Sequence, residues 1–321
     1  MKGVHGIGWL AAMRRHALLG AAAVLLAAAV WMPPFEQSRQ VSSYIVTFDI
    51  TQSMDTEDLT LAGRPVSRLA YAKAAMQQVL QRLPCGSRIG WSVFTGTRSL
   101  LLFVPVDVCS HYDALLSSLD DIGGQMRWTD SSVIAQGGIY SAVQAASQPD
   151  SRAAVVFITD GQEAPPVAPT DTTVRGITQG QAPGWLIGVG GDQPAPIPHT
   201  DAQGARIGYW QADEVVQRAP AGSGGVAGVG GHEELSELRE PYLRAVAAHT
   251  GFGYRRLDGA DALYAAMSDP RLGQRMQVAT DFRWCPALAA LVLLLLRFLP
   301  LRQRARGSAW IAGEPVTAAR G

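Results

Sequence analysis

The segment Tyr44-Ile-Val-Thr-Phe-Asp-Ile-Thr-Gln-Ser53 decides the fold of this chain, because polar side chains directly follow an apolar run. Residues 44–48 have the β-branched and aromatic composition of a strand. The strand ends at Asp49, and Thr51 and Ser53 follow at alternate positions. One carboxylate and two hydroxyls in a single loop form an oxygen-only set that suits a Mg²⁺-like ion. The sequence therefore predicts a metal site at the end of this strand.

Strand-like and helix-like segments alternate after this loop. We expect helices at 69–83, 111–121, 132–147 and 233–249, and strands at 43–48, 88–94, 99–104, 153–158 and 185–189. This alternation predicts an α/β fold, with a doubly wound, mostly parallel sheet covered on both faces by helices. Ligands bind such sheets at the carboxyl ends of the strands. Asp160, which follows the strand at 153–158, is therefore expected to lie beside Asp49.

The chain resembles a von Willebrand factor type A domain over residues 43–268. The motif Asp49-x-Thr51-x-Ser53, a later loop threonine and Thr159-Asp160-Gly161 are similar to that family's metal-ion-dependent adhesion site, although the family usually has serine where this chain has Thr51. The resemblance implies a Rossmann-like domain, here with Pro/Gly-rich insertions, that holds Mg²⁺ and leaves one coordination position for a partner's carboxylate. The implied ligands are Asp49, Thr51, Ser53, Thr129 and Asp160.

Alternatives remain for several of these assignments. In the second loop, Ser131 or Ser132 could replace Thr129 as the ligand, and the ion could be Mn²⁺ or Ca²⁺. Asp49 could only cap a turn, and Asp160 could only belong to an Asp-Gly turn, since both residue types serve these purposes. Their joint occurrence after two apolar strands favours metal binding.

Two apolar runs predict membrane anchoring of the domain. Residues 17–32 are uncharged and follow two arginines, as in a transmembrane signal-anchor, with cleavage of a signal peptide as the alternative. Residues 285–301 form a second run with one arginine near its end. The excess of positive charge before the first run places residues 1–16 and the tail at 302–321 in the cytoplasm. The main domain is then expected in the periplasm, outside the bacterial inner membrane.

The cysteines support an oxidising compartment. Cys85 precedes the first strand of a predicted hairpin, and Cys109 follows the second strand. The two are almost equally distant from the turn at Gly96-Thr97, so we expect them to face each other and form a disulfide. The alternative is two separate buried thiols. Cys285 lies in the second apolar run and is expected to be unpaired.

The segment from Pro165 to Tyr209 is rich in proline and glycine and follows Asp160. We expect it to lie beside the metal loops and to take part in partner recognition, since loops often carry this role. A solvated connector is the alternative. Within the segment, Asp201-Ala-Gln-Gly204 is expected to be the tip of a small hairpin.

Composition and motifs argue against several functions. The formal net charge is +0, so no global field favours nucleic acid. No Gly-x-Ser-x-Gly motif occurs, and His232 has no second histidine four residues further on, as a zincin would. Because no nucleophile with an adjacent base is visible, we expect that the protein is not an enzyme.

Longer segments resemble the membrane-anchored von Willebrand A proteins of bacterial methanol-oxidation clusters, the MxaL type. The segments are Tyr44–Met54, Leu83–Trp91, Thr159–Pro166 and Leu235–Leu243. This resemblance implies a periplasm-facing docking protein that assists assembly or metal loading of a partner, namely methanol dehydrogenase or its other accessory proteins. The alternative is an adaptor in another cell-envelope complex, of the aerotolerance type or linked to a chaperone.

Overall fold

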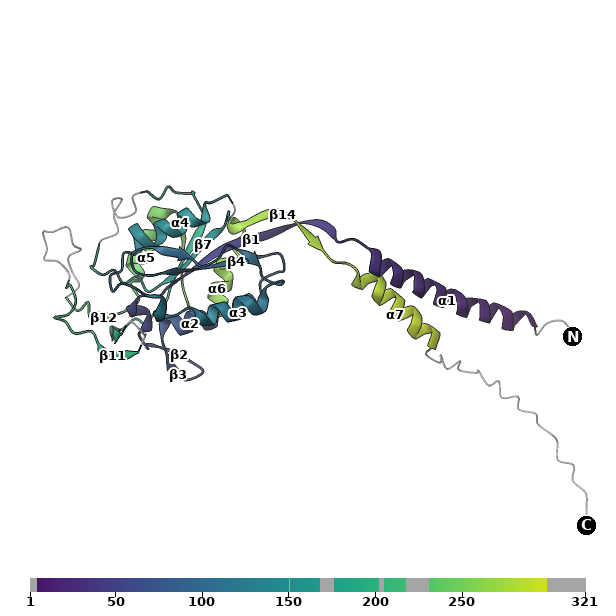
Figure 1. Cartoon of the computed structure of the whole chain (residues 1–321), viewed down its shortest axis with the longest axis horizontal. Coiled ribbons are helices and arrows are strands. Elements are labelled where there is room, and N and C mark those ends of the chain that lie inside the picture. Colours follow the sequence, from purple (N-terminus) through teal and green to yellow (C-terminus); the bar gives the residue numbers. More distant parts are fainter. Residues whose placement is uncertain (1–4, 150, 168–175, 202–204, 218–230, 299–321) are drawn as a thin grey trace, which may run out of the picture. The chain divides into compact units, whose positions relative to one another are not determined.

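The structure is a computed structural model that describes residues 5–149, 151–167, 176–201, 205–217 and 231–298. The chain forms two compact units, and each is described by itself. The larger unit comprises Ser38–Met276 and contains the central sheet, which is shown in Figure 1. The smaller unit combines Met1–Gln37 with Gln277–Gly321.

The central sheet has the strand order β13-β8-β7-β1-β4-β5. These strands are β13 (Gly253–Arg256), β8 (Gly184–Gly188), β7 (Ala154–Thr159), β1 (Phe35–Asp49), β4 (Arg88–Phe94) and β5 (Ser99–Leu101). Pairing is parallel from β13 to β4, and β5 and β6 (Val106–Asp107) pair antiparallel with β4. In addition, β14 (Gly273–Thr280) pairs with β1. The predicted mostly parallel α/β sheet is thus confirmed.

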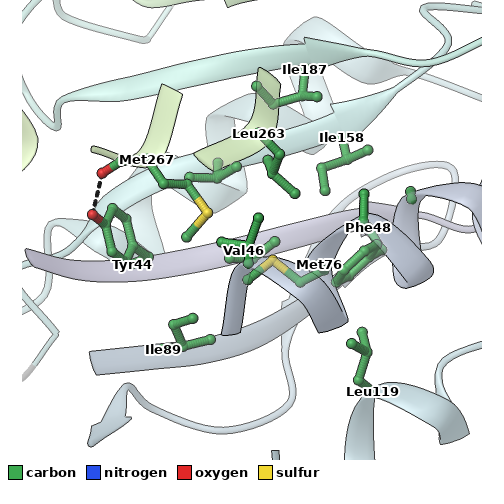
Figure 2. Close-up of a cluster of buried hydrophobic side chains, with 14 of the residues drawn as sticks. Tyr44, Val46, Phe48, Met76, Ile89, Leu119, Ile158, Ile187, Leu263 and Met267 are labelled. Atoms are coloured by element: carbon green, nitrogen blue, oxygen red, sulfur yellow. Dashed lines mark hydrogen bonds between the residues drawn. The ribbon is translucent and has the colours of Figure 1, made fainter. Parts of the chain in front are cut away.

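Helices cover both faces of this sheet (Figure 1). One face packs against α2 (Arg68–Leu80), α3 (Tyr112–Asp121) and α6 (Ala260–Met267), and the other against α4 (Tyr140–Ala146) and α5 (Glu240–Thr250). Successive side chains of a strand point to opposite faces. Val46 and Phe48 accordingly join the first core, seen in Figure 2, whereas Ile45 joins the second. The Tyr44 hydroxyl donates to the carbonyl oxygen of Met267 in the first core.

Two predicted helices differ from the structure. The helix expected at 132–147 begins with a π-helical turn at Ile134–Ile139, where a side chain on Gly137 would place its Cβ 2.0 Å from the carbonyl oxygen of Thr97. The helix expected at 233–249 begins only at Glu240, with Pro241 in its first turn, where the missing N–H of proline is harmless. The preceding residues form β12 (Leu235–Ser236), which pairs with β9 (Ala195–Pro196).

Small hairpins and turns complete the larger unit. The hairpins are β2 (Leu59–Leu61) with β3 (Arg64–Val66), and β10 (Pro198–Thr200) with β11 (Arg206–Tyr209). Short 3-10 turns lie at Gln52–Asp55, Gly124–Met126 and Pro270–Leu272. The β10–β11 pair is the hairpin expected around 201–204, although residues 202–204 at its tip lie outside the described residues.

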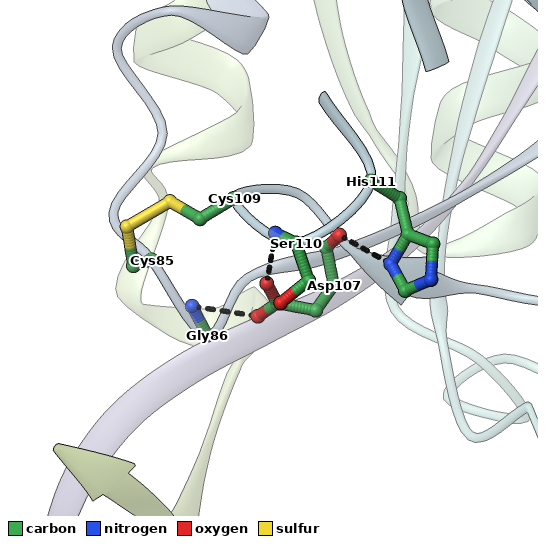
Figure 3. Close-up of a disulfide and its surroundings, with 6 residues drawn as sticks. All are labelled: Cys85, Gly86, Asp107, Cys109, Ser110 and His111. Carbon is green, nitrogen blue, oxygen red and sulfur yellow. Dashed lines mark hydrogen bonds between the residues drawn. A yellow bond between two sulfur atoms is a disulfide. The ribbon is translucent and has the colours of Figure 1, made fainter. Parts of the chain in front are cut away.

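Cys85 and Cys109 are joined by a disulfide, with their Cα atoms 5.3 Å apart (Figure 3). The bridge lies at the amino end of β4, where the Asp107 carboxylate accepts hydrogen bonds from the backbone N–H groups of Gly86 (3.0 Å) and Ser110 (2.8 Å). These contacts tie the start of β4 to the segment that leads into α3. Cys285 is a free, exposed thiol.

In the smaller unit, α1 (His5–Trp31) packs against α7 (Trp284–Phe298). The ring of Phe35 meets that of Phe282 edge to face at 6.3 Å, and Arg283 Nε donates to the carbonyl oxygen of Met32 (2.9 Å). Within the described part of the chain, no helix combines the length and apolar character needed to cross a membrane, so the spans expected at 17–32 and 285–301 are not confirmed. Residues 299–321, which include the end of the second run and the tail, lie outside that part.

Candidate metal centre

Asp49 lies fully buried at the carboxyl end of β1 and is held by neighbouring hydroxyls. Its Oδ1 accepts hydrogen bonds from the backbone N–H of Thr51 (2.9 Å) and from Thr51 Oγ1 (2.7 Å). Its Oδ2 accepts one from Thr159 Oγ1 (2.6 Å) at the end of β7. Thr51 Oγ1 lies 3.2 Å from Ser53 Oγ. The first loop and the end of β7 thus bring one carboxylate and three hydroxyls together.

Asp160, one residue beyond β7, is also fully buried. Its Oδ1 accepts from the backbone N–H of Gln162 (2.9 Å), and its Oδ2 accepts from Arg68 Nη1 (2.7 Å) and, more weakly, from Ser236 Oγ (3.3 Å). Arg68 is itself fully buried and forms a second ion pair with Asp58 (2.6 Å). The guanidinium therefore neutralises part of the charge of Asp160 from inside the domain.

The two carboxylates interact electrostatically, as expected for residues at the ends of neighbouring parallel strands. Burial, reinforced by the charge of Asp160, raises the pKa of Asp49 from 3.8 to about 7, although the hydrogen bonds from Thr159 and Thr51 oppose this rise. A cation held between the two carboxylates would lower that pKa, because it favours the ionised form.

The second loop presents three hydroxyls with different surroundings. Thr129 Oγ1 and Ser131 Oγ lie 2.8 Å apart and form a hydrogen bond with each other. Ser132 is bound through its backbone to Ala164, but its buried Oγ has no hydrogen-bond partner. Ser131 and Ser132, together with Thr51 and Ser53, line one cavity.

The residues present fit a divalent metal ion that prefers oxygen. The described residues contain no group of three or more His, Cys, Asp and Glu side chains that could hold a metal ion. Ligation here would therefore depend on hydroxyls as well as carboxylates, a hard-oxygen set in which Mg²⁺ retains several waters. The unpartnered Oγ of Ser132 is a further observation in favour, since buried hydroxyls normally have a partner.

Parts of the Pro165–Tyr209 segment contact the first metal loop through Gln52. Gln52 Oε1 accepts hydrogen bonds from the backbone N–H of Thr200 (3.1 Å) and from the indole N–H of Trp210 (3.0 Å). Trp210 lies just beyond the segment. Gln52 Nε2 donates to Asp130 Oδ1 (2.5 Å) in the second loop. The described part of the segment thus lies against the metal loops, while residues 168–175 and 202–204 are outside the described residues.

No sequence motif assigns a role to Arg68, Asp58 or Ser236. One signal was available for Arg68, because it lies four residues before Ala72 and eight before Met76, on the stripe of α2 that faces the core. An arginine on such a stripe needs a buried counterion. No local pattern indicates which carboxylates provide it.

The fold and the centre define a doubly wound α/β domain with an oxygen-rich site at the carboxyl edge of its sheet. No protein-family model matches the chain, and no curated protein matches it either. Among solved structures, BatB from Bacteroides thetaiotaomicron is similar at 21% identity and a TM-score of 0.48, covering 71% of this chain and 96% of that one.

Two further solved structures are similar. An aerotolerance-related membrane protein from Bacteroides fragilis has 20% identity and a TM-score of 0.47 over 71% of this chain and 96% of that one. The manganese-loaded TRAP protein from Plasmodium vivax has 11% identity and a TM-score of 0.40 over 76% of this chain and 80% of that one. At such scores, the fold assignment depends on the strand order and contacts of this chain itself.

Proposed function

We propose that this protein is a metal-dependent protein-docking module of the von Willebrand A type. The observation that carries the proposal is the convergence of Asp49 and Asp160 with the hydroxyls of Thr51 and Ser53 at the carboxyl edge of a parallel sheet. Ligands bind sheets of this kind at that edge. Mg²⁺ is the proposed ion, with Mn²⁺ or Ca²⁺ as alternatives.

In this proposal a carboxylate of the partner protein would complete the coordination of the ion. Asp49, Thr51, Ser53 and Asp160 would hold the ion together with one hydroxyl of the second loop, which is that of Thr129 by resemblance. Ser132 is the alternative that its unpartnered hydroxyl favours. Arg68 orients Asp160, because it donates to Oδ2 and leaves Oδ1 with a single backbone donor.

Titration calorimetry on the purified full-length protein tests the metal site. Asp49→Asn should weaken Mg²⁺ binding by at least about 100-fold. Loss of a residue that merely hydrogen-bonds a metal ligand already lowers metal affinity by about 10–100-fold. The control is Asp261→Asn, which removes an exposed carboxylate on α6. Equal Mg²⁺ affinity in the wild type and in Asp49→Asn would refute the site.

We further propose that the domain is anchored to the bacterial inner membrane and faces the periplasm. Many apolar side chains of the two helices in the smaller unit are exposed: Val24, Leu26, Val30, Trp31, Leu288, Leu291, Val292, Leu295, Leu296 and Phe298. A lipid environment would cover such side chains. The disulfide between Cys85 and Cys109 supports an oxidising compartment. Release of the protein from membranes by high salt alone would argue against this anchoring.

The proposed partner is periplasmic methanol dehydrogenase, whose assembly or metal loading the protein would assist. Support comes from the sequence resemblance to proteins of methanol-oxidation clusters. In a strain carrying Asp160→Ala, the protein should remain in the membrane fraction, while the exported dehydrogenase should lack Ca²⁺ and dye-linked activity. A fully active, metal-loaded dehydrogenase in a deletion strain would exclude this partner and favour an adaptor in another envelope complex.

A further inference from the structure

A cavity of about 280 Å³ borders the candidate metal centre, and both metal loops and the insertion after β8 line it. Thr51 and Ser53 line it from the first loop, and Ser131 and Ser132 from the second. Ile197, Trp210 and residues 214–216 contribute from the segment after β8. A group that reaches the metal loops from a partner would therefore pass beside this cavity.

The cavity has a one-sided charge. Asp130, Glu163, Glu214 and Glu233 line it, and none of its lining residues is a lysine, arginine or histidine. Glu233 forms an ion pair with Arg239 at 3.4 Å. Among the ion pairs of the described residues, none includes the other three carboxylates. Charge complementarity therefore favours a cationic occupant.

Glu163 is the most buried of the three lining carboxylates that have no ion pair among the described residues. Only 7% of this residue is exposed. Its Oε1 accepts hydrogen bonds from the backbone N–H of Ala135 (3.2 Å) and from the Tyr242 hydroxyl, whereas its buried Oε2 has no partner. Burial also raises the pKa of this carboxyl group. An unsatisfied buried carboxylate oxygen is costly, and a positive charge in the cavity would favour the ionised form of this carboxyl group.

The remaining wall of the cavity is apolar. Pro165, Pro166, Ile197 and the Trp210 indole form it. His199 stacks on Trp210, with ring centroids 3.9 Å apart and planes inclined by 13°. The occupant thus needs an apolar stem and a cationic head, as arginine and lysine have. A planar guanidinium suits both the carboxylates and an aromatic wall better than an ammonium does.

We propose that this cavity receives an arginine side chain of the docked partner, so that the protein recognises an acidic and a basic residue close together. This inference rests on the proposed function, because the acidic residue would ligate the ion. The metal loops would then select for a carboxylate, and the cavity would select among partners that carry one.

Three capped peptides separate the contribution of the carboxylate at the metal site from that of the arginine in the cavity. Their binding is measured on full-length protein with saturating Mg²⁺. They are Asp-Gly-Arg, Asp-Gly-citrulline and Asn-Gly-Arg, and calorimetry measures their affinities. Replacing arginine by its neutral isostere citrulline should weaken binding about tenfold, as should Glu214→Gln in the protein. The two changes combined should cost little more than either alone, because they remove the same interaction. Asp261→Asn, on an exposed ion pair of α6, is the charge-matched control.

Equal affinities for the arginine and citrulline peptides would overturn the inference. Failure of the proposed function gives a different result. In that case Asn-Gly-Arg would bind as tightly as Asp-Gly-Arg, while the difference between arginine and citrulline would remain. If only Asp-Gly-Arg of the three peptides binds tightly, the result supports both the proposed function and the arginine cavity.

Discussion

The two ends of the central sheet are built in different ways. At the amino end of β4, Cys85 and Cys109 are joined by a disulfide, and the Asp107 carboxylate accepts hydrogen bonds from two nearby backbone N–H groups. At the carboxyl end of β1 and β7, the buried carboxylates of Asp49 and Asp160 lie close to each other, and among the described residues only Asp160 has an ion pair. The amino end is thus held by a covalent bond and local hydrogen bonds. At the carboxyl end, the repulsion between Asp49 and Asp160 remains, and a bound cation can relieve it.

The two ends contribute differently to the stability of the domain and to ligand binding. A disulfide stabilises mainly by restricting the unfolded chain. A pair of buried carboxylates instead destabilises the ligand-free domain and becomes favourable only with a counterion. Arg68 provides part of that counterion for Asp160 and leaves Asp49 without one. Substitutions at the carboxyl end should therefore change both stability and Mg²⁺ binding, whereas loss of the disulfide should change stability alone.

Replacing the buried guanidinium should have the largest effect. Arg68→Met leaves Asp58 and Asp160 buried without their ion pair, which should lower the free energy of unfolding by about 3–5 kcal/mol. Urea unfolding measures this change. Arg82→Met, which breaks the exposed pair with Asp261, should change it by less than about 1 kcal/mol. Equal effects of the two substitutions would contradict a special role for the buried pair.

The pH dependence of stability should reveal the raised pKa of Asp49. Its folded-state pKa is raised to about 7 from 3.8, so between these values the folded protein binds a proton that the unfolded chain has released. In EDTA, this group should therefore lower the free energy of unfolding as the pH rises from about 4 to about 7, by up to about 4 kcal/mol at about 1.4 kcal/mol per unit. Asp49→Asn should lose this component. Parallel pH profiles of the two proteins would show that Asp49 titrates normally.

Removing the disulfide should affect only the other end of the sheet. The cysteines are 24 residues apart, so replacing both Cys85 and Cys109 by serine should cost roughly 3 kcal/mol in urea unfolding. Mg²⁺ affinity should stay unchanged, because the metal loops lie at the opposite strand ends. Cys285→Ser, at the free thiol, should change neither quantity. A loss of Mg²⁺ affinity in the double variant would show that the two ends are coupled.

Thr159 should have the smallest effect of the four. Its hydroxyl donates to Asp49 Oδ2 at 2.6 Å and accepts from the backbone N–H of Gly161 at 3.0 Å, so Thr159→Val removes both hydrogen bonds while keeping the side-chain shape. Above pH 7 we expect a loss of about 1.5–3 kcal/mol in the free energy of unfolding. Thr159→Ser retains the hydroxyl and should stay close to the wild type. A similar loss in both variants would show that the hydroxyl alone does not account for the effect.

Much of the sheet could be predicted because its signals are local. The apolar runs before Asp49 and Asp160 identify buried parallel strands, and their ends necessarily meet at one edge. Helix boundaries were less accurate where tertiary contacts override spacing. Leu235 and Leu238 have helical spacing with the residues that follow, but the pairing of β12 with β9 and Pro241 delay the helix to Glu240.

The sequence by itself determined which strand ends carry carboxylates and hydroxyls, because each motif directly follows the apolar run that forms its strand. Only the tertiary structure decided how these groups are neutralised. Arg68 and Asp160 are 92 residues apart, and Arg68 and Ser236 are 168 apart. Burial of ionised groups requires partners in space, and these come from whichever segments the fold brings together. Chain order alone does not specify such partners.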